Sequence, residues 1–298
     1  MIHPFPKYLE EIKTGNIRSL ARCISLIENE AYGYETLLEA VNPGNNIKIT
    51  GITGPPGAGK STLVDALTGA FVVQGKKVAV LCVDPSSPFS FGALLGDRIR
   101  MSRWYDHPDV YIRSLATRGS LGGLHPKIIE ITELLKAAGF DHIIVETVGV
   151  GQSEVEITGL SDTTVVVLVP ESGDDIQSMK AGLMEIADIF VVNKSDRPEA
   201  DIFVRTLKLM MAHGSRKAAI VKTVASDKLG IAELIKEIED HQTLQAIPDK
   251  RSWLLTERAF HILQQQKMKG YDKNIIRAEI ERELIKGRFN LFRYVKGK

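Results

Sequence analysis

The chain has 298 residues, a length that fits one large α/β domain with additional segments. Apolar residues make up 44% and charged residues 25%, which excludes a disordered chain and a fibrous repeat. Lysine and arginine number 38 against 37 aspartate and glutamate, so the net charge of +1 creates no global field that would favour nucleic acid.

The two cysteines, Cys23 and Cys82, lack the spacing of a disulfide framework or a zinc site. No apolar run approaches the roughly 18 residues of a membrane span, and the first residues lack the apolar core of a signal peptide. We therefore expect an unprocessed cytoplasmic protein that binds neither nucleic acid nor a membrane.

The first predicted element is a helical extension over residues 1–45. Apolar residues recur there at three- and four-residue steps, and the pattern breaks near Gly15 and Gly33. This spacing predicts amphipathic helices.

The pattern changes near Asn46, where short apolar runs begin to alternate with longer helical ones. Their nearly continuous hydrophobicity indicates strands that are covered on both faces. Seven segments fit, namely IKITGI, KVAVLCVD, DVYIR, DHIIVET, TTVVVLVP, DIFVVNK and AAIVKTV. We expect a mostly parallel, doubly wound α/β domain over residues 46–245.

A helical C-terminal arm is predicted over residues 246–298. The sequence AIPD at 246–249 breaks the α/β pattern, and charged helical periodicity without a further strand follows. Its apolar positions favour either pairing with a second copy of the chain or packing against its own domain.

Residues 54–61, GPPGAGKS, match the pattern G-x-x-x-x-G-K-(S/T) between a predicted strand and a predicted helix. The glycines let backbone N–H groups turn towards phosphates, while Lys60 supplies a cation and Ser61 a hydroxyl for Mg²⁺. The alternative is a glycine-rich turn that binds nothing. We predict a P-loop NTPase whose phosphate-binding residues are Gly54, Pro55, Pro56, Gly57, Ala58, Gly59, Lys60, Ser61 and Thr62.

Three acidic residues, Asp84, Asp97 and Glu146, are candidates for completing a Mg²⁺ site with Ser61. Asp84 and Glu146 end predicted strands, and strand ends face the nucleotide crevice of such a sheet. The alternative for these two residues is strand-end capping. For Asp97, which precedes Arg98, the alternative is an ordinary loop salt bridge.

Asn193-Lys194-Ser195-Asp196 follows a predicted strand and matches the N-K-x-D motif of GTPases. The Asp196 carboxylate can accept two hydrogen bonds from guanine, and adenine offers no such pair of donors. Lys194 would lie along the base, and Asn193 would brace neighbouring loops. The motif therefore predicts preference for GTP and GDP.

A further loop after the last predicted strand contains Val224, Ala225 and Ser226. GTPases place backbone donors to the guanine O6 at this position. An ordinary turn, with Ser226 or Asp227 capping the next helix, is the alternative.

Six stretches together resemble the MeaB/ArgK-like GTPases associated with methylmalonyl-CoA mutase, a family in the SIMIBI class of P-loop proteins. They are GITGPPGAGKST, VDPSSPFSFGALLGDRIRM, IRSLATRGSLGGL, ETVGVGQSE, SGDDIQSMKAG and NKSD, within residues 10–270.

The resemblance implies a homodimeric, GTP-dependent chaperone that gates cofactor loading or protection in an adenosylcobalamin-dependent acyl-CoA mutase. It also implies that Asp84, Asp97 and Glu146 surround Mg²⁺ and the catalytic water. Residues 174–180 look like a mobile switch that senses nucleotide and client.

The catalytic residues that we predict are Lys60, Asp97, Glu146 and Lys180. Glu146 begins the sequence ETVG, where ordinary GTPases have D-x-x-G, and no glutamine follows that glycine directly. We therefore expect slow hydrolysis without a partner. Lys180 and Arg118 are the candidates for the cation that stabilises charge on the γ-phosphoryl group. For Arg118 the alternative is an ordinary surface arginine.

Two other functions remain open at this point. One is a kinase linked to amino-acid transport, such as transport of arginine or ornithine, which the P-loop alone permits. The other is a metal-delivery GTPase like the nickel insertases, against which the histidines, scattered without cysteine neighbours, argue.

Overall fold

A computed structural model describes residues 5–41, 47–84, 101–118, 123–147, 156–172, 182–212, 218–244, 248–268, 270–287 and 289–297. The chain forms two compact units, residues 1–254 and 255–298. The domain boundaries expected from the sequence, after residues 45 and 245, stay a prediction. Within the described ranges, no helix is both long and apolar enough to cross a membrane.

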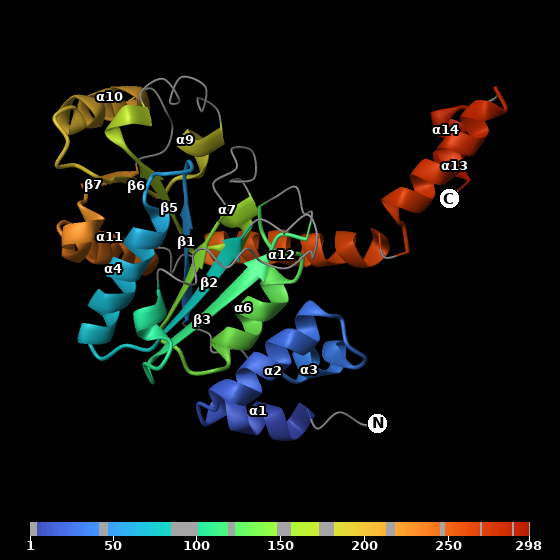
Figure 1. The fold of residues 1–298 in the computed structure, drawn as a ribbon, viewed down its shortest axis with the longest axis horizontal. Coiled ribbons are helices and arrows are strands. Elements are labelled where there is room, and N and C mark those ends of the chain that lie inside the picture. The colour runs from blue at the N-terminus through green and yellow to red at the C-terminus, as the bar shows by residue number, and fades with distance from the viewer. Residues whose placement is uncertain are drawn as a thin grey trace. The chain divides into compact units, whose positions relative to one another are not determined.

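A parallel sheet of seven strands forms the centre of the first unit (Figure 1). Its strands are β1 (Lys48–Thr53), β2 (Val78–Asp84), β3 (Val110–Ala116), β4 (His142–Glu146), β5 (Thr163–Leu168), β6 (Ile189–Val192) and β7 (Ala219–Lys222). Their order is β3-β2-β4-β1-β5-β6-β7, and every neighbouring pair is parallel. The predicted α/β fold class is confirmed.

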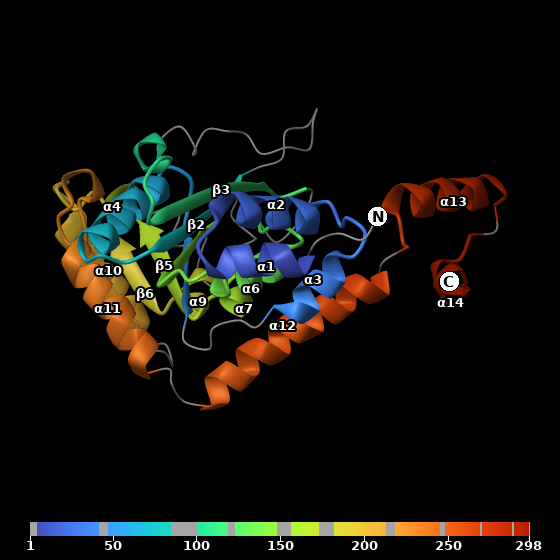
Figure 2. The same ribbon diagram turned by 90° about the horizontal axis from the view of Figure 1, so that it is seen from below.

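Helices cover both faces of this sheet (Figures 1 and 2). On one face lie α4 (Lys60–Val73) and α11 (Ile231–Leu244). On the other lie α6 (Ile128–Lys136), α7 (Glu156–Leu160), α9 (Gly182–Ile186) and α10 (Ala200–Ala212). Strand β5 shows why consecutive residues of such a strand are apolar: Val165 packs towards α4 and α11, and Val166 packs towards α9 and α10.

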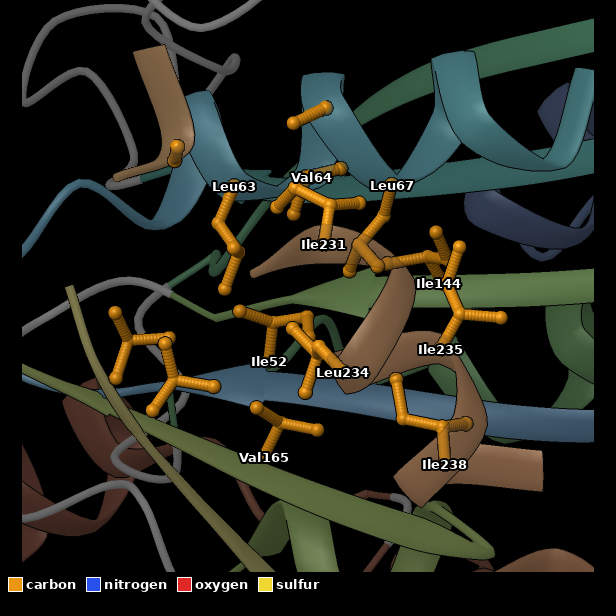
Figure 3. Packing of buried hydrophobic residues seen from close by; sticks show 14 of the residues in the cluster. Ile52, Leu63, Val64, Leu67, Ile144, Val165, Ile231, Leu234, Ile235 and Ile238 are labelled. Carbon is orange, nitrogen blue, oxygen red and sulfur yellow. The ribbon is translucent and has the colours of Figure 1, made fainter. Parts of the chain in front are cut away.

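The main core lies between the sheet and the pair α4 and α11, as Figure 3 shows. The labelled side chains come from β1, β4, β5 and both helices, and each is at most 4% exposed; they are Ile52, Leu63, Val64, Leu67, Ile144, Val165, Ile231, Leu234, Ile235 and Ile238. Burial of one such side chain contributes roughly 1.5–3 kcal/mol. This core fixes α4, and therefore the loop that precedes it, on the sheet.

Three N-terminal helices belong to the same unit: α1 (Phe5–Lys13), α2 (Ile17–Glu28) and α3 (Tyr34–Ala40). The predicted breaks at Gly15 and Gly33 are present, both with φ of +86°. Asn16 begins α2 by accepting a hydrogen bond from the Ser19 backbone N–H. Helices α2 and α3 pack against α6.

The second unit contains the end of α12 (Pro248–Met268), α13 (Lys273–Ile285) and α14 (Leu291–Lys296). Asp272 caps α13 through hydrogen bonds from the N–H groups of Asn274 and Ile275. The Tyr294 hydroxyl donates to Glu279 at 2.5 Å, which joins α14 to α13.

Three aspartates stand just before strands, at the amino edge of the sheet. Asp162 accepts a hydrogen bond from the Ile49 N–H at 2.8 Å, and Asp188 accepts one from the Thr164 N–H at 2.9 Å. Asp141 binds the Lys77 N–H at 2.8 Å in the same way. Each carboxylate thus accepts a hydrogen bond from an N–H group at the start of a neighbouring strand or just before it.

We expect Asp162→Ala to lower the free energy of unfolding by about 1–3 kcal/mol, because it leaves the N–H of the buried Ile49 without its acceptor. Asp141→Ala is the matched control, since its contact with Lys77 is exposed and should cost about 0.5 kcal/mol. Denaturant titration of both variants measures the difference. Equal losses would contradict this account.

His125 is 2% exposed and precedes α6. Its Nδ1 accepts a hydrogen bond from the Lys127 backbone N–H at 2.9 Å. Burial, followed by the positive charges of Arg118, Lys127 and Arg113, lowers the pKa of His125 from 6.5 to about 4. The imidazole is therefore neutral in the folded protein at neutral pH.

Because this pKa is lower in the folded than in the unfolded chain, the stability linked to His125 is complete above pH 6.5 and is lost as the pH falls towards 4. The loss should reach about 2 kcal/mol at pH 5. We expect the His125→Gln variant to show a correspondingly smaller fall in unfolding free energy between pH 7 and pH 5. Parallel pH profiles for the two proteins would refute this assignment.

Candidate functional site

The loop between β1 and α4 lies very close to two other parts of the fold. Gly54 has φ of +136°, and a Cβ there would lie 2.1 Å from the Val167 carbonyl oxygen of β5. Gly59 has φ of +87°, and a Cβ there would lie 2.4 Å from Nδ2 of Asn193. Glycine is therefore required at both positions by backbone conformation and by space.

Lys60 begins α4 and is 8% exposed. Its ammonium donates hydrogen bonds to the carbonyl oxygens of Gly54 at 2.9 Å and Pro55 at 3.1 Å. These contacts hold the cation against the loop that the sequence predicts to bind phosphate.

Ser61, Asp84 and Glu146 bring oxygen atoms to the carboxyl edge of the sheet. The Ser61 hydroxyl donates to Glu146 Oε1 at 2.7 Å. Asp84 and Glu146 are each 3% exposed and end the adjacent strands β2 and β4. A hydroxyl and two carboxylates are hard oxygen donors, so this set fits Mg²⁺.

Two threonines hold the end of β4 against β1. The Thr147 hydroxyl donates to the Thr53 hydroxyl at 2.9 Å, and the Thr147 N–H donates to the Ile52 carbonyl at 3.0 Å. These bonds fix the backbone immediately after Glu146.

Across the part of the chain that the structure describes, no group of three or more His, Cys, Asp or Glu side chains is placed to hold a metal ion. A Mg²⁺ ion at Ser61, Asp84 and Glu146 would therefore need further oxygens, such as those of nucleotide phosphates. Asp97 and Lys180, which the sequence places in this site, lie outside the described residues, as does the segment 174–180.

Asn193 connects the phosphate loop to the loop after β7. Its Nδ2 donates to the Ala58 carbonyl at 2.9 Å, while its Oδ1 accepts from the Thr223 hydroxyl and the Ala225 N–H, each at 3.1 Å. Asn193 is 3% exposed, so these bonds are protected from water. One side chain thus braces both loops.

The rest of the N-K-x-D segment is more open to solvent. The Lys194 ammonium donates to the Gly57 carbonyl at 2.9 Å, and Lys194 has φ of +54°. The Ser195 N–H donates to the Thr223 carbonyl at 3.0 Å, and Asp196 is exposed. The Asp196 carboxylate can therefore receive a ligand from solvent.

The loop after β7 is a single 3₁₀ turn, Ala225–Asp227. The Val224 N–H donates to the Leu229 carbonyl at 3.1 Å. Gly230 lets the chain pass close to the end of β7, since a Cβ there would lie 2.0 Å from the Lys222 carbonyl oxygen. The turn lies beside Asn193 through the Ala225 N–H.

The structure places the side chain of Arg118 against the N-terminal helix α2. Its guanidinium donates to the Glu28 carbonyl at 2.6 Å and to Asn29 Oδ1 at 3.3 Å. These contacts differ from the expectation that Arg118 approaches the phosphates. The reason is that the end of β3 lies beside the C-terminal end of α2.

Sequence reasoning missed a contact on α4, the helix that carries Ser61. The Asp65 carboxylate accepts hydrogen bonds from Arg103 Nε at 3.0 Å and from Trp104 Nε1 at 2.7 Å. It thereby fixes the chain that follows residues 85–100. No spacing could reveal it, because these residues are 38 and 39 positions apart.

The family model described as methylmalonyl Co-A mutase-associated GTPase MeaB matches residues 20–276. The chain belongs to the MeaB family. The resemblance stated from the sequence motifs is therefore confirmed.

Among relatives of this MeaB-family chain, a protein of Pyrococcus horikoshii named as a GTPase is 48% identical over 249 residues, covering 81% of this chain and 78% of its own. A fused isobutyryl-CoA mutase of Geobacillus kaustophilus is 40% identical over 200 residues, which are 63% of this chain and 18% of that protein. The solved structure of a LAO/AO transport system kinase has a TM-score of 0.72 and 25% identity, covering 100% of this chain and 97% of its own. The protein is thus a P-loop GTPase that hydrolyses GTP.

We expect Gly59→Ala to abolish measurable GDP binding, because the new Cβ would displace Asn193 from the phosphate loop. Gly139→Ala is the control: its φ is +75° and nothing lies within 4 Å of the added Cβ. Both variants should lose about 1 kcal/mol of stability through backbone strain. Calorimetric titration with GDP distinguishes the two variants. Retained GDP binding in Gly59→Ala would contradict this prediction, because the loop would then tolerate separation from Asn193.

Proposed function

We propose that this MeaB-family GTPase is a chaperone-type switch for an adenosylcobalamin-dependent acyl-CoA mutase, gating cofactor loading or protection. The observation that carries the proposal is the relative in which a segment similar to this chain is part of a fused isobutyryl-CoA mutase. The description of the family as methylmalonyl Co-A mutase-associated supports a mutase as the client. A methylmalonyl-CoA mutase is the first candidate.

In the proposed nucleotide complex, Lys60 exchanges the carbonyls of Gly54 and Pro55 for phosphate oxygens. This exchange replaces neutral acceptors by charged ones, which form stronger hydrogen bonds with an ammonium. Backbone N–H groups of residues 57–62 would surround the remaining phosphate oxygens, since Pro55 and Pro56 have no N–H to donate.

Ser61, Asp84 and Glu146 would hold Mg²⁺, directly or through water. The ion supplies positive charge that neutralises the phosphate oxygens. Ser61 would turn its hydroxyl oxygen from the Glu146 contact towards the ion. Glu146 is one methylene longer than aspartate and would hold and orient a water beside the γ-phosphate. Asp97 and Lys180 stay predictions as further catalytic residues.

Guanine recognition is assigned to Asp196, with Lys194 along the base and backbone N–H groups of Val224, Ala225 and Ser226 near the O6 atom. The bridging position of Asn193 supports this assignment, because it puts these loops next to the phosphate loop. An adenine base would leave the carboxylate without its two donors.

A homodimer through residues 246–298 is part of the proposal. The described part of the second unit exposes many large apolar side chains, which favours pairing with another chain. They include Leu255, Phe260, Leu263, Met268, Ile275, Leu284, Ile285, Leu291, Phe292 and Val295. We also propose a cytoplasmic location.

A kinase is the second candidate, favoured by the name of the structural relative, LAO/AO transport system kinase. Transfer of labelled phosphate from GTP or ATP to arginine, ornithine or a protein would establish it. Release of inorganic phosphate alone would favour the GTPase switch.

The experiment that tests the switch is steady-state GTP hydrolysis with and without an adenosylcobalamin-dependent mutase. We expect slow turnover alone and at least roughly tenfold stimulation by the client, because a partner would complete the catalytic site. Asp196→Asn is the control, since it should lose GTP binding and hence stimulation. No response to methylmalonyl-CoA or isobutyryl-CoA mutase would remove the assigned partner.

A further inference from the structure

Two arginines, Arg113 of β3 and Arg118 just after it, bind the C-terminal end of helix α2. Arg118 donates to the Glu28 carbonyl at 2.6 Å and to Asn29 Oδ1 at 3.3 Å. Arg113 forms an ion pair with the Glu28 carboxylate and donates to the Ser25 hydroxyl at 3.1 Å. Both cations therefore bind the same turn of the same helix.

The last turn of a helix suits such cations. Its final carbonyl groups have no partner within the helix, and the helix dipole makes this end negative. The guanidinium of Arg118 binds one of these carbonyls directly. The Asn29 N–H donates to the carbonyls of Ile27 and Ser25, so these two carbonyls have partners within the turn.

Arg118 is also linked to the candidate Mg²⁺ site, because the residue before it is hydrogen-bonded to Asp84. In the parallel register, Ala116 of β3 is opposite Asp84 of β2, and the Thr117 N–H donates to the Asp84 carbonyl at 3.1 Å. The backbone of Asp84 is thus joined through Thr117 to Arg118 and from there to α2. Arg113, by contrast, is opposite Leu81, three residues before Asp84.

The backbone of Arg118 is held in an uncommon conformation. Its φ is +47°, in the left-handed region that non-glycine residues rarely adopt. Such a conformation is strained and persists only where surrounding contacts enforce it. The bonds to α2 provide such contacts.

We propose that Arg118 is a positioning residue that links the carboxyl ends of β2 and β3 to helix α2. Docking of the N-terminal helices then sets the position of Asp84. The position of Asp84 in turn sets the affinity for Mg²⁺ with nucleotide. The inference rests on the proposed Mg²⁺ site. Because linkage between two binding events is reciprocal, Mg²⁺ with GDP must in turn tighten the docking of α2.

The test compares wild-type protein with Arg118→Ala, Arg118→Lys and the control Arg113→Ala. GDP binding is titrated against Mg²⁺ concentration, and hydrogen exchange of the backbone amides of residues 17–28 is followed with and without Mg²⁺ and GDP. Arg113→Ala also removes a positive charge that binds helix α2, but Arg113 is opposite Leu81 and not next to Asp84.

In Arg118→Ala we expect the Mg²⁺ concentration for half-maximal GDP binding to rise at least roughly fivefold, a typical size for coupling between sites. Mg²⁺ and GDP should slow exchange in α2 of the wild-type protein and have no such effect in this variant. Arg118→Lys should restore part of the coupling, because an ammonium still binds a helix carbonyl. Arg113→Ala should lower stability and keep the Mg²⁺ dependence of the wild type.

Asp84→Asn separates failure of this inference from failure of the metal site. If Asp84→Asn changes the Mg²⁺ dependence and Arg118→Ala does not, the positioning role is wrong and the metal site stands. If neither variant changes it, the metal site and this inference both fall. A large loss of GTP turnover in Arg118→Ala at saturating Mg²⁺, with exchange in α2 unaltered, would make Arg118 a catalytic cation instead.

Discussion

The close approach of the phosphate loop to β5 and to Asn193 is the constraint on which the rest of the site depends. With no space for a Cβ at Gly54 or Gly59, the loop packs on the Val167 carbonyl on one side and on the Asn193 amide on the other. Asn193 then extends the contact to the Ala225 N–H. The groups that we propose to bind phosphates and the groups that we propose to read the base are therefore one connected structure.

The carboxylates at the amino edge of the sheet, where the strands start, differ in their contacts from those at the carboxyl edge, where the strands end. At the amino edge, Asp141, Asp162 and Asp188 satisfy backbone N–H groups and stabilise the strand starts. At the carboxyl edge, Asp84 and Glu146 end neighbouring strands, and Glu146 accepts a hydrogen bond from Ser61. This is the edge at which parallel α/β sheets bind their ligands. Similar carboxylates thus stabilise strand starts at one edge and are proposed to bind the ligand at the other, according to strand direction.

Much of this arrangement could be predicted from the sequence, because it depends on local patterns. The seven strands follow from apolar runs, the helix breaks from Gly15 and Gly33, and the phosphate loop from its spacing. Contacts between distant segments could not be predicted. Arg118 was one of two candidates for a cation near the phosphates, yet its guanidinium binds the end of α2, about 90 residues away in the chain. Asp65 with Trp104 is a second example, since neither residue belongs to a motif.

Guanine-nucleotide binding by this connected site is the central claim, and calorimetric titration of the purified protein with GDP and with ADP in the presence of Mg²⁺ tests it most directly. We expect GDP to bind at least roughly 100-fold more tightly, because adenine would leave the Asp196 carboxylate without its two donors. Equal affinities for the two nucleotides would contradict the account.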